Sequence, residues 1–183
     1  MRDRLLLATQ AVLIVVDLQE TYRDKLHEWT RTAARAAVLI RGARLLGIPT
    51  FCTEQYPKGL GPTAPEIRSA LEDAPILEKL SFSALGAPGL TELIRAQGRP
   101  QAIVCGIETH VCINHTVHDL IELGFHVHLP VDALSSRHVT DHEIGLRKML
   151  GSGAIPASTE SALLECMRGA EHPKFRAVQA LLK

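Results

Sequence analysis

The feature that most constrains the fold is an alternation between short, continuously apolar segments and longer amphipathic ones. Residues 11–16 read AVLIVV and lead directly into Asp17. A run this short, with many β-branched residues and no alternating polar positions, is typical of a strand that is covered on both faces. Such strands belong to parallel sheets, which need crossover connections that are usually helical. The sequence therefore predicts an α/β protein.

Other segments repeat this pattern along the chain. Further strands are predicted at residues 48–53, 101–106, 125–131 and 154–156. Helices are predicted at residues 30–47, 65–73, 90–98, 109–124, 139–150, 159–168 and 174–182. The Pro- and Gly-rich residues 54–65 predict a loop, whereas residues 75–84 have an irregular pattern that favours no element. Because no linker, repeat or low-complexity segment interrupts the pattern, we expect a single domain over residues 1–183.

Composition narrows the classes of function. Lys+Arg and Asp+Glu each number 20, so no basic excess is available to bind nucleic acid. No segment approaches the ~20 apolar residues of a membrane span, and the apolar residues 5–8 are too few for the core of a signal peptide. The four cysteines form no CxxC pair, and free thiols are typical of a reducing compartment. We therefore expect a cytoplasmic protein with neither a membrane nor a nucleic-acid partner.

Two residues lie where an α/β active site is expected, just beyond the carboxyl ends of strands. Asp17 ends the first predicted strand, where an ionised side chain is costly unless it is paired or functional; a helix cap or turn is the alternative. Cys112 falls in the first turn of the helix after residues 101–106. There the helix dipole favours thiolate, and free N–H groups can bind an oxyanion. The alternative is that Cys112 only packs its helix on the sheet. Lys79 alone would indicate a solvated charge.

Three motifs join these residues: VVDLQ at 15–19, EKLSFS at 78–83 and GIETHVCI at 106–113. With this order and spacing, the chain resembles the isochorismatase-like cysteine hydrolase superfamily over essentially its whole length. Residues 53–61 and 131–137 are similar to the subgroup containing the isochorismatase-domain proteins of animal mitochondria and their bacterial relatives.

The resemblance implies a three-layer α/β/α doubly wound fold with a six-stranded, mostly parallel sheet, in a homo-oligomer that is a dimer or larger. It also implies a catalytic triad of Asp17, Lys79 and Cys112, and a cis peptide between Ile107 and Glu108. The backbone N–H groups of Glu108 and Cys112 would form an oxyanion hole.

The chemistry implied is hydrolysis of a small molecule at a C–N bond of an amide, carbamoyl or ureido group, through a thioester and without a cofactor. The expected pocket residues are Gln19, Gln55, Tyr56, Phe82 and His110. The alternative for Gln55 and Tyr56 is a structural loop that packs against a neighbouring subunit. Phe82 could instead anchor its loop in the core, and His110 could be an ordinary polar residue at a helix start.

Other chemistries fit less well. The nine histidines form no HExxH motif, and residues 52–58 (CTEQYPK) lack the Asp-x-His and further His of the nicotinamidase branch. We therefore expect no catalytic metal. True isochorismatases of the family lack the nucleophilic Cys, so Cys112 argues against that substrate. The remaining alternative is a catalytically weak member that acts as an oligomeric binding or scaffold protein.

Overall fold

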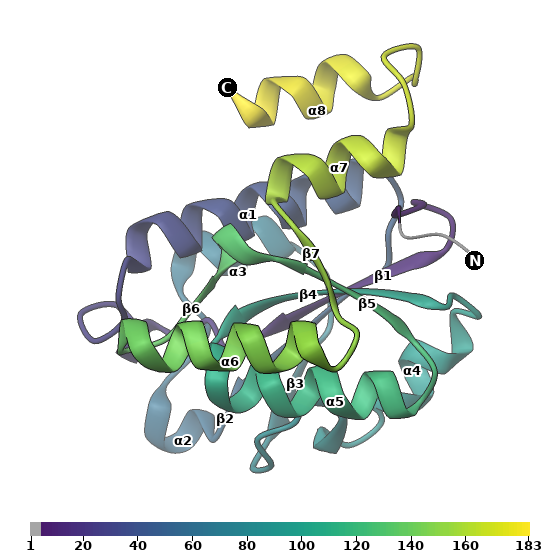
Figure 1. The fold of residues 1–183 in the computed structure, drawn as a ribbon. Coiled ribbons are helices and arrows are strands. Elements are labelled where there is room, and N and C mark those ends of the chain that lie inside the picture. The colour runs from purple at the N-terminus through teal and green to yellow at the C-terminus, as the bar shows by residue number, and fades with distance from the viewer. Residues whose placement is uncertain (1–4) are drawn as a thin grey trace.

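A parallel β-sheet forms the centre of the molecule in a computed structural model, which describes residues 5–183 (Figure 1). The strands of its main path lie in the order β3-β2-β1-β4-β5-β7, and every pairing is parallel. A short β6 pairs with the end of β4, beyond the part of β4 that β5 covers. The strands are β1 (Ala11–Val16), β2 (Thr50–Gln55), β3 (Ile76–Lys79), β4 (Gln101–Ile107), β5 (His126–Pro130), β6 (Leu134–Ser135) and β7 (Ile155–Ala157).

Helices cover both faces of this sheet, as expected for a three-layer α/β/α fold (Figure 1). One layer contains α1 (Trp29–Leu45), α3 (Pro65–Leu71), α7 (Thr159–Met167) and α8 (Phe175–Leu182). The other layer contains α4 (Leu90–Ala96), α5 (Asn114–Glu122) and α6 (Val139–Gly151). The short α2 (Pro57–Leu60) follows β2.

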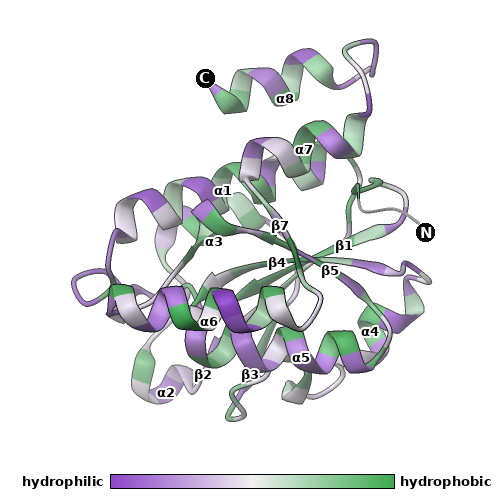
Figure 2. Ribbon diagram, in the orientation of Figure 1, coloured by the Kyte–Doolittle hydropathy of each residue, from purple (hydrophilic) through white to green (hydrophobic). Residues whose placement is uncertain are grey.

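The strand β1 shows why the sheet needs both layers. Leu13 and Val15 pack into the cluster around α1, whereas Val12, Ile14 and Val16 pack into the cluster around α4 and α5. All of these side chains are fully buried, and burial of one such side chain stabilises the fold by about 2 kcal/mol. Figure 2 shows the resulting pattern, with apolar strands in the centre and polar helix surfaces outside.

The predicted elements are confirmed with small shifts at their ends, apart from four regions. The loop predicted at residues 54–65 is wrong in part, because this segment contains the end of β2 and the four-residue helix α2, which begins at Pro57. Residues 75–84 contain the edge strand β3, which the sequence did not reveal because it has four residues and its apolar side chains are only half-buried. The helix predicted at 109–124 begins as a π-helical turn, Thr109–Ile113, before α5. The two-residue β6 was not predicted. The first four residues of the expected domain lie outside the described part.

Gly106 allows β1 and β4 to approach each other closely where the site forms. Its φ of +124° is unfavourable for other residues, and a Cβ atom there would lie 2.0 Å from the carbonyl oxygen of Val16. The strand ends that carry Asp17 and the Cys112 turn are thereby held side by side. Within residues 5–183, no helix is both long and apolar enough to cross a membrane.

The buried His128 on β5 should make the fold sensitive to acid. Its side chain is fully buried, and neither ring nitrogen has a hydrogen-bond partner among the described residues. Burial, with a smaller contribution from His126, lowers the pKa of His128 from 6.5 to about 4. The unfolded chain therefore takes up this proton at higher pH, so stability should fall as the pH drops from about 6.5 to about 4.

We expect His128→Leu to remove about 3 kcal/mol of this pH-dependent loss, the equivalent of the pKa difference. Urea denaturation of the wild type and of His128→Leu, at several pH values between about 4 and 7, measures how the free energy of unfolding depends on pH. His138→Leu, at an exposed position before α6, is the matched control. Equal acid sensitivity of the wild type and His128→Leu would show that His128 is not the cause.

Candidate active site

A buried ion pair lies at the carboxyl end of the sheet. Asp17 follows β1 in a left-handed conformation (φ 55°), and its Oδ2 accepts a 2.6 Å hydrogen bond from Nζ of Lys79, the last residue of β3. The Thr53 hydroxyl on β2 donates to Asp17 Oδ1 at 2.8 Å. Lys79 and Asp17 are 3% and 2% exposed. The ends of three neighbouring strands therefore fix one carboxylate through both of its oxygens.

The Lys79 ammonium is surrounded by oxygen atoms. Besides Asp17, it donates to Gln55 Oε1 at 2.6 Å and to the carbonyl oxygens of Ser81 and Phe82 at 3.1 Å each. The loop after β3 thus folds back over its own lysine. The sequence around Lys79 alone indicates a solvated surface charge. In the structure, the Lys79 ammonium is instead buried and donates to four oxygen atoms.

Cys112 lies beside this pair, in the π-helical turn that follows β4. It is 8% exposed, it lines the same cavity as Asp17, and both Asp17 and Lys79 influence the pKa of its thiol. Burial, and then the charge of Asp17, raise the pKa of the thiol to about 12, although Lys79 acts in the opposite direction. Burial of the thiol therefore opposes the helix start, which was expected to favour thiolate, and favours the protonated thiol in the free protein.

The Asp17 carboxyl has the properties of a proton acceptor. Burial raises its pKa above the ordinary 3.8, while Lys79, Thr53 and Cys112 lower it through charge or hydrogen bonds. A raised pKa makes the carboxylate a better base than a solvated aspartate. Its position next to the thiol provides a route for the proton.

The peptide between Ile107 and Glu108 is cis, as the family resemblance implies. Within the described part of the chain, the Glu108 N–H has no hydrogen-bond acceptor. The Glu108 side chain is held by Arg137, whose backbone N–H and Nε donate to Oε2 at 2.9 and 3.0 Å. Glu108 thus links the π-helical turn that contains Cys112 to the segment after β6.

A cavity of about 270 Å³ opens onto these groups. Its lining includes Gln55 and Phe82, two of the residues expected in the pocket. Tyr22 and Arg137 also line it and were missed. Tyr22 follows β1 and Arg137 follows β6. Their positions beyond the carboxyl ends of strands could have identified them as candidate pocket residues. The complete lining is Asp17, Tyr22, Gln55, Phe82, Ile107, Glu108, Val111, Cys112 and Arg137.

Three residues expected in the pocket lie outside this cavity. Gln19 is fully buried, and its amide donates to the carbonyl oxygens of Gln55 and Gly61 and accepts from the Gln55 N–H. It therefore ties two loops together. Tyr56 is about half exposed and lines a neighbouring groove of about 430 Å³ beside β3. The His110 ring turns towards the Ser136 hydroxyl, 3.1 Å from Nδ1.

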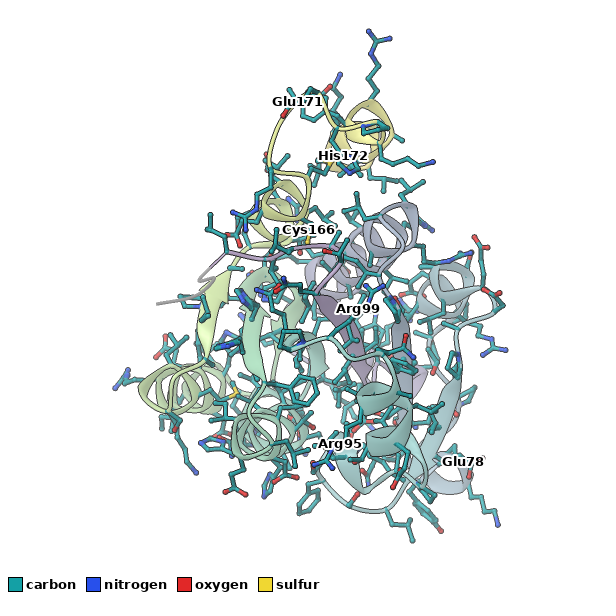
Figure 3. The ribbon with its side chains drawn as sticks, turned by 90° about the vertical axis from the view of Figure 1, so that its right-hand side faces the viewer. Glu78, Arg95, Arg99, Cys166, Glu171 and His172 are labelled. Carbon is teal, nitrogen blue, oxygen red and sulfur yellow. The ribbon has the colours of Figure 1, made fainter. Side chains whose placement is uncertain are left out.

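The other cysteines lie in different surroundings. Cys52 and Cys105 are fully buried inside strands, and burial raises the pKa of Cys105 to about 12. Cys166 lies on α7, in the helical layer opposite α5 (Figure 3). Among residues 5–183, all four cysteines are free, and no three His, Cys, Asp or Glu side chains come close enough together to hold a metal ion.

Comparisons with known proteins agree with the resemblance in the motifs. The family model for the isochorismatase domain matches residues 11–161. Isochorismatase domain-containing protein 2 of Danio rerio is 40% identical over 173 residues, which cover 94% of this chain and 86% of the relative. Isochorismatase domain-containing protein 2A of Mus musculus is 39% identical, with 97% and 85% of the two chains covered.

Solved structures show the same architecture. The structure titled MAR1 ribonuclease from Caenorhabditis elegans has a TM-score of 0.93 and 39% identity, over 97% of this chain and 91% of that one. The YcaC gene product of Escherichia coli, described as an octameric hydrolase of unknown specificity, has a TM-score of 0.87 over 98% and 97% of the chains. At 22% identity, this second likeness concerns the fold alone. The sequence matches, the parallel sheet and the six-strand main path together show that the chain belongs to the isochorismatase family.

Proposed function

We propose that the protein is a cytosolic, homo-oligomeric cysteine hydrolase that cleaves a C–N bond in a small amide, carbamoyl or ureido compound. The observation that carries this proposal is the buried ion pair of Asp17 and Lys79 beside Cys112, with Asp17 and Cys112 lining the same cavity. Packing alone does not require these three groups together, because a buried ion pair is seldom more stable than apolar residues of similar size.

In the first half of the reaction, Asp17 accepts the thiol proton as the Cys112 sulfur bonds to the substrate carbonyl carbon. The carbonyl oxygen takes up the electron pair, and we assign its stabilisation to the N–H groups of Glu108 and Cys112. The protonated Asp17 then donates to the leaving nitrogen as the C–N bond breaks. Ammonia or an amine departs, and a thioester remains on Cys112.

In the second half, Asp17 accepts a proton from water as the water oxygen attacks the thioester carbon. The C–S bond breaks, the thiol regains its proton, and the carboxylic or carbamic acid leaves. Lys79 keeps Asp17 in place and offsets its charge while the sulfur carries negative charge. The high pKa of the resting thiol agrees with proton transfer during attack rather than with a stable thiolate.

The homo-oligomer is supported by the surface beside the cavity. Tyr56, Leu80 and Phe82 are large, exposed side chains around the loop after β3, and Leu80 is 76% exposed. Contiguous exposed apolar groups are typical of protein interfaces. The octamer described for the YcaC gene product shows that this fold is compatible with such assembly.

RNA cleavage is a second candidate, because the nematode relative is titled a ribonuclease. We rank it lower because the chain has equal numbers of basic and acidic residues, and each of the two cations near the cavity is paired with a carboxylate. The third candidate is a catalytically weak family member that acts as an oligomeric binding or scaffold protein.

We expect Cys112→Ala to lower ammonia release from a responsive amide by about 1,000-fold or more, because the nucleophile is lost. A coupled ammonia assay measures it, with thermal melting to verify the fold. Cys166→Ala is the control, since that thiol lies in the opposite helical layer. Retained amide hydrolysis in Cys112→Ala would remove Cys112 from the mechanism. RNA cleavage that survives in Cys112→Ala would not come from this site.

We expect Lys79→Met to lower the free energy of unfolding by about 3–5 kcal/mol, because it leaves the Asp17 carboxylate buried without its cation. Urea denaturation measures this loss. Lys58→Met, at an exposed position on α2, should change it by less than about 0.5 kcal/mol. The double variant Asp17→Asn/Lys79→Met should recover most of the loss. If the double variant is no more stable than Lys79→Met, an unpaired carboxylate is not the source of the instability.

A further inference from the structure

Two side chains that line the cavity keep free hydrogen-bonding groups, whereas those of the Asp17–Lys79 pair and Gln55 are occupied. Both Asp17 oxygens have donors, and the Lys79 ammonium has four acceptors. The Gln55 amide accepts from Lys79 and donates to the Leu80 carbonyl oxygen at 2.8 Å. By contrast, within the described part of the chain, the Tyr22 hydroxyl and both Nη groups of Arg137 make no hydrogen bond.

Arg137 is fixed in orientation while these donors stay free. Glu108 binds its backbone N–H and Nε through Oε2, which holds the guanidinium plane by one edge. The Nη1–Nη2 edge has no acceptor in the described structure, and the side chain is about half exposed at the cavity. Two parallel N–H groups on such an edge match the two oxygens of a carboxylate.

The Tyr22 hydroxyl lies near the same place. Tyr22 is half-buried and lines the cavity together with Arg137 and Cys112. Burial raises the pKa of Tyr22, and Glu108, Cys112 and Asp17 raise it further, while Arg137 acts in the opposite direction. Because Tyr22 lines the same cavity as Arg137, its hydroxyl can donate to an anion held by Arg137.

We propose that Tyr22 and Arg137 bind a carboxylate of the substrate, so that the enzyme prefers small amides that carry an acid group a few bonds from the scissile carbonyl. This proposal rests on the proposed hydrolase function and specifies its substrate class. The cavity volume of about 270 Å³ is below the ~300–1,000 Å³ of drug-sized ligand sites, which agrees with a small molecule.

Selectivity would come from hydrogen bonding rather than from a positive field. The Asp17–Lys79 and Glu108–Arg137 pairs each cancel, so the cavity carries no net charge from them. A carboxylate accepts from both Nη groups and from Tyr22. A carboxamide of the same shape has one oxygen acceptor and brings an NH₂ group against a donor, so it leaves one guanidinium N–H unpaired.

The test compares the monoamides of malonic, succinic and glutaric acids with the corresponding diamides. Binding is measured by isothermal titration to Cys112→Ala protein, which separates recognition from turnover. We expect at least one monoamide to bind about tenfold or more tightly than its diamide, as is typical of a charged hydrogen-bonded pair. Tyr22→Phe should reduce this preference about 3–10-fold, the effect of one hydrogen bond. Arg137→Met should abolish it.

Arg147→Met, at an exposed position on α6, is the matched control and should leave the preference unchanged. Tyr22→Phe removes no hydrogen bond of the described protein, so it tests the site even if Arg137→Met disturbs Glu108. Equal binding of acid and amide throughout the panel, or a preference that survives both variants, would overturn the carboxylate site. If the wild type releases no ammonia from any compound but the preference is lost in both variants, the site stands and the hydrolase proposal fails.

Discussion

The buried pairing of Asp17 with Lys79 is the interaction on which the site depends. A charge placed at the end of a fully apolar strand is costly, and here it is offset by a cation, a hydroxyl and the loop that covers them. Because Lys79 is itself held by Gln55 and two backbone carbonyls, the pair also fixes the loop after β3. The same loop places Phe82 at the cavity.

The sheet topology explains why Cys112 lies beside this pair. The strand order reverses between β1 and β4, which is the point where α/β sheets form their crevice. Asp17 follows β1 and Cys112 follows β4, so the two residues flank the reversal. Gly106 permits the close contact of these strands. Gly145 permits close packing of α6 on the turn that contains Cys112, since a Cβ atom at Gly145 would lie 2.7 Å from the Cα of His110.

The sequence predicted the elements whose burial shows as a local pattern of apolar residues. It was less informative about residues whose environment depends on tertiary contacts. The strands β1 and β4 were predictable because their sequences are short and continuously apolar, and α1 because its sequence is amphipathic. The edge strand β3 was not, because its side chains alternate too weakly over four residues. Asp17 and Cys112 could be located from strand ends, but the burial of Lys79 depends on groups brought by β1 and β2. For Gln19, the position after β1 was misleading. It suggested a pocket residue, but the Gln19 amide donates to the backbone carbonyl oxygens of Gln55 and Gly61.

Whether Asp17 acts as a base on Cys112 can be measured by comparing the rate of Cys112 alkylation by iodoacetamide at neutral pH in the wild type and in Asp17→Asn. We expect alkylation to be slower by about 100-fold in Asp17→Asn, because a thiol with a pKa of about 12 needs a base during attack. If the carboxylate were only a neighbouring charge, its removal would leave the Lys79 cation beside the thiol, lower the pKa of Cys112 and make alkylation faster. A faster reaction in Asp17→Asn would therefore contradict the assignment of Asp17 as the base.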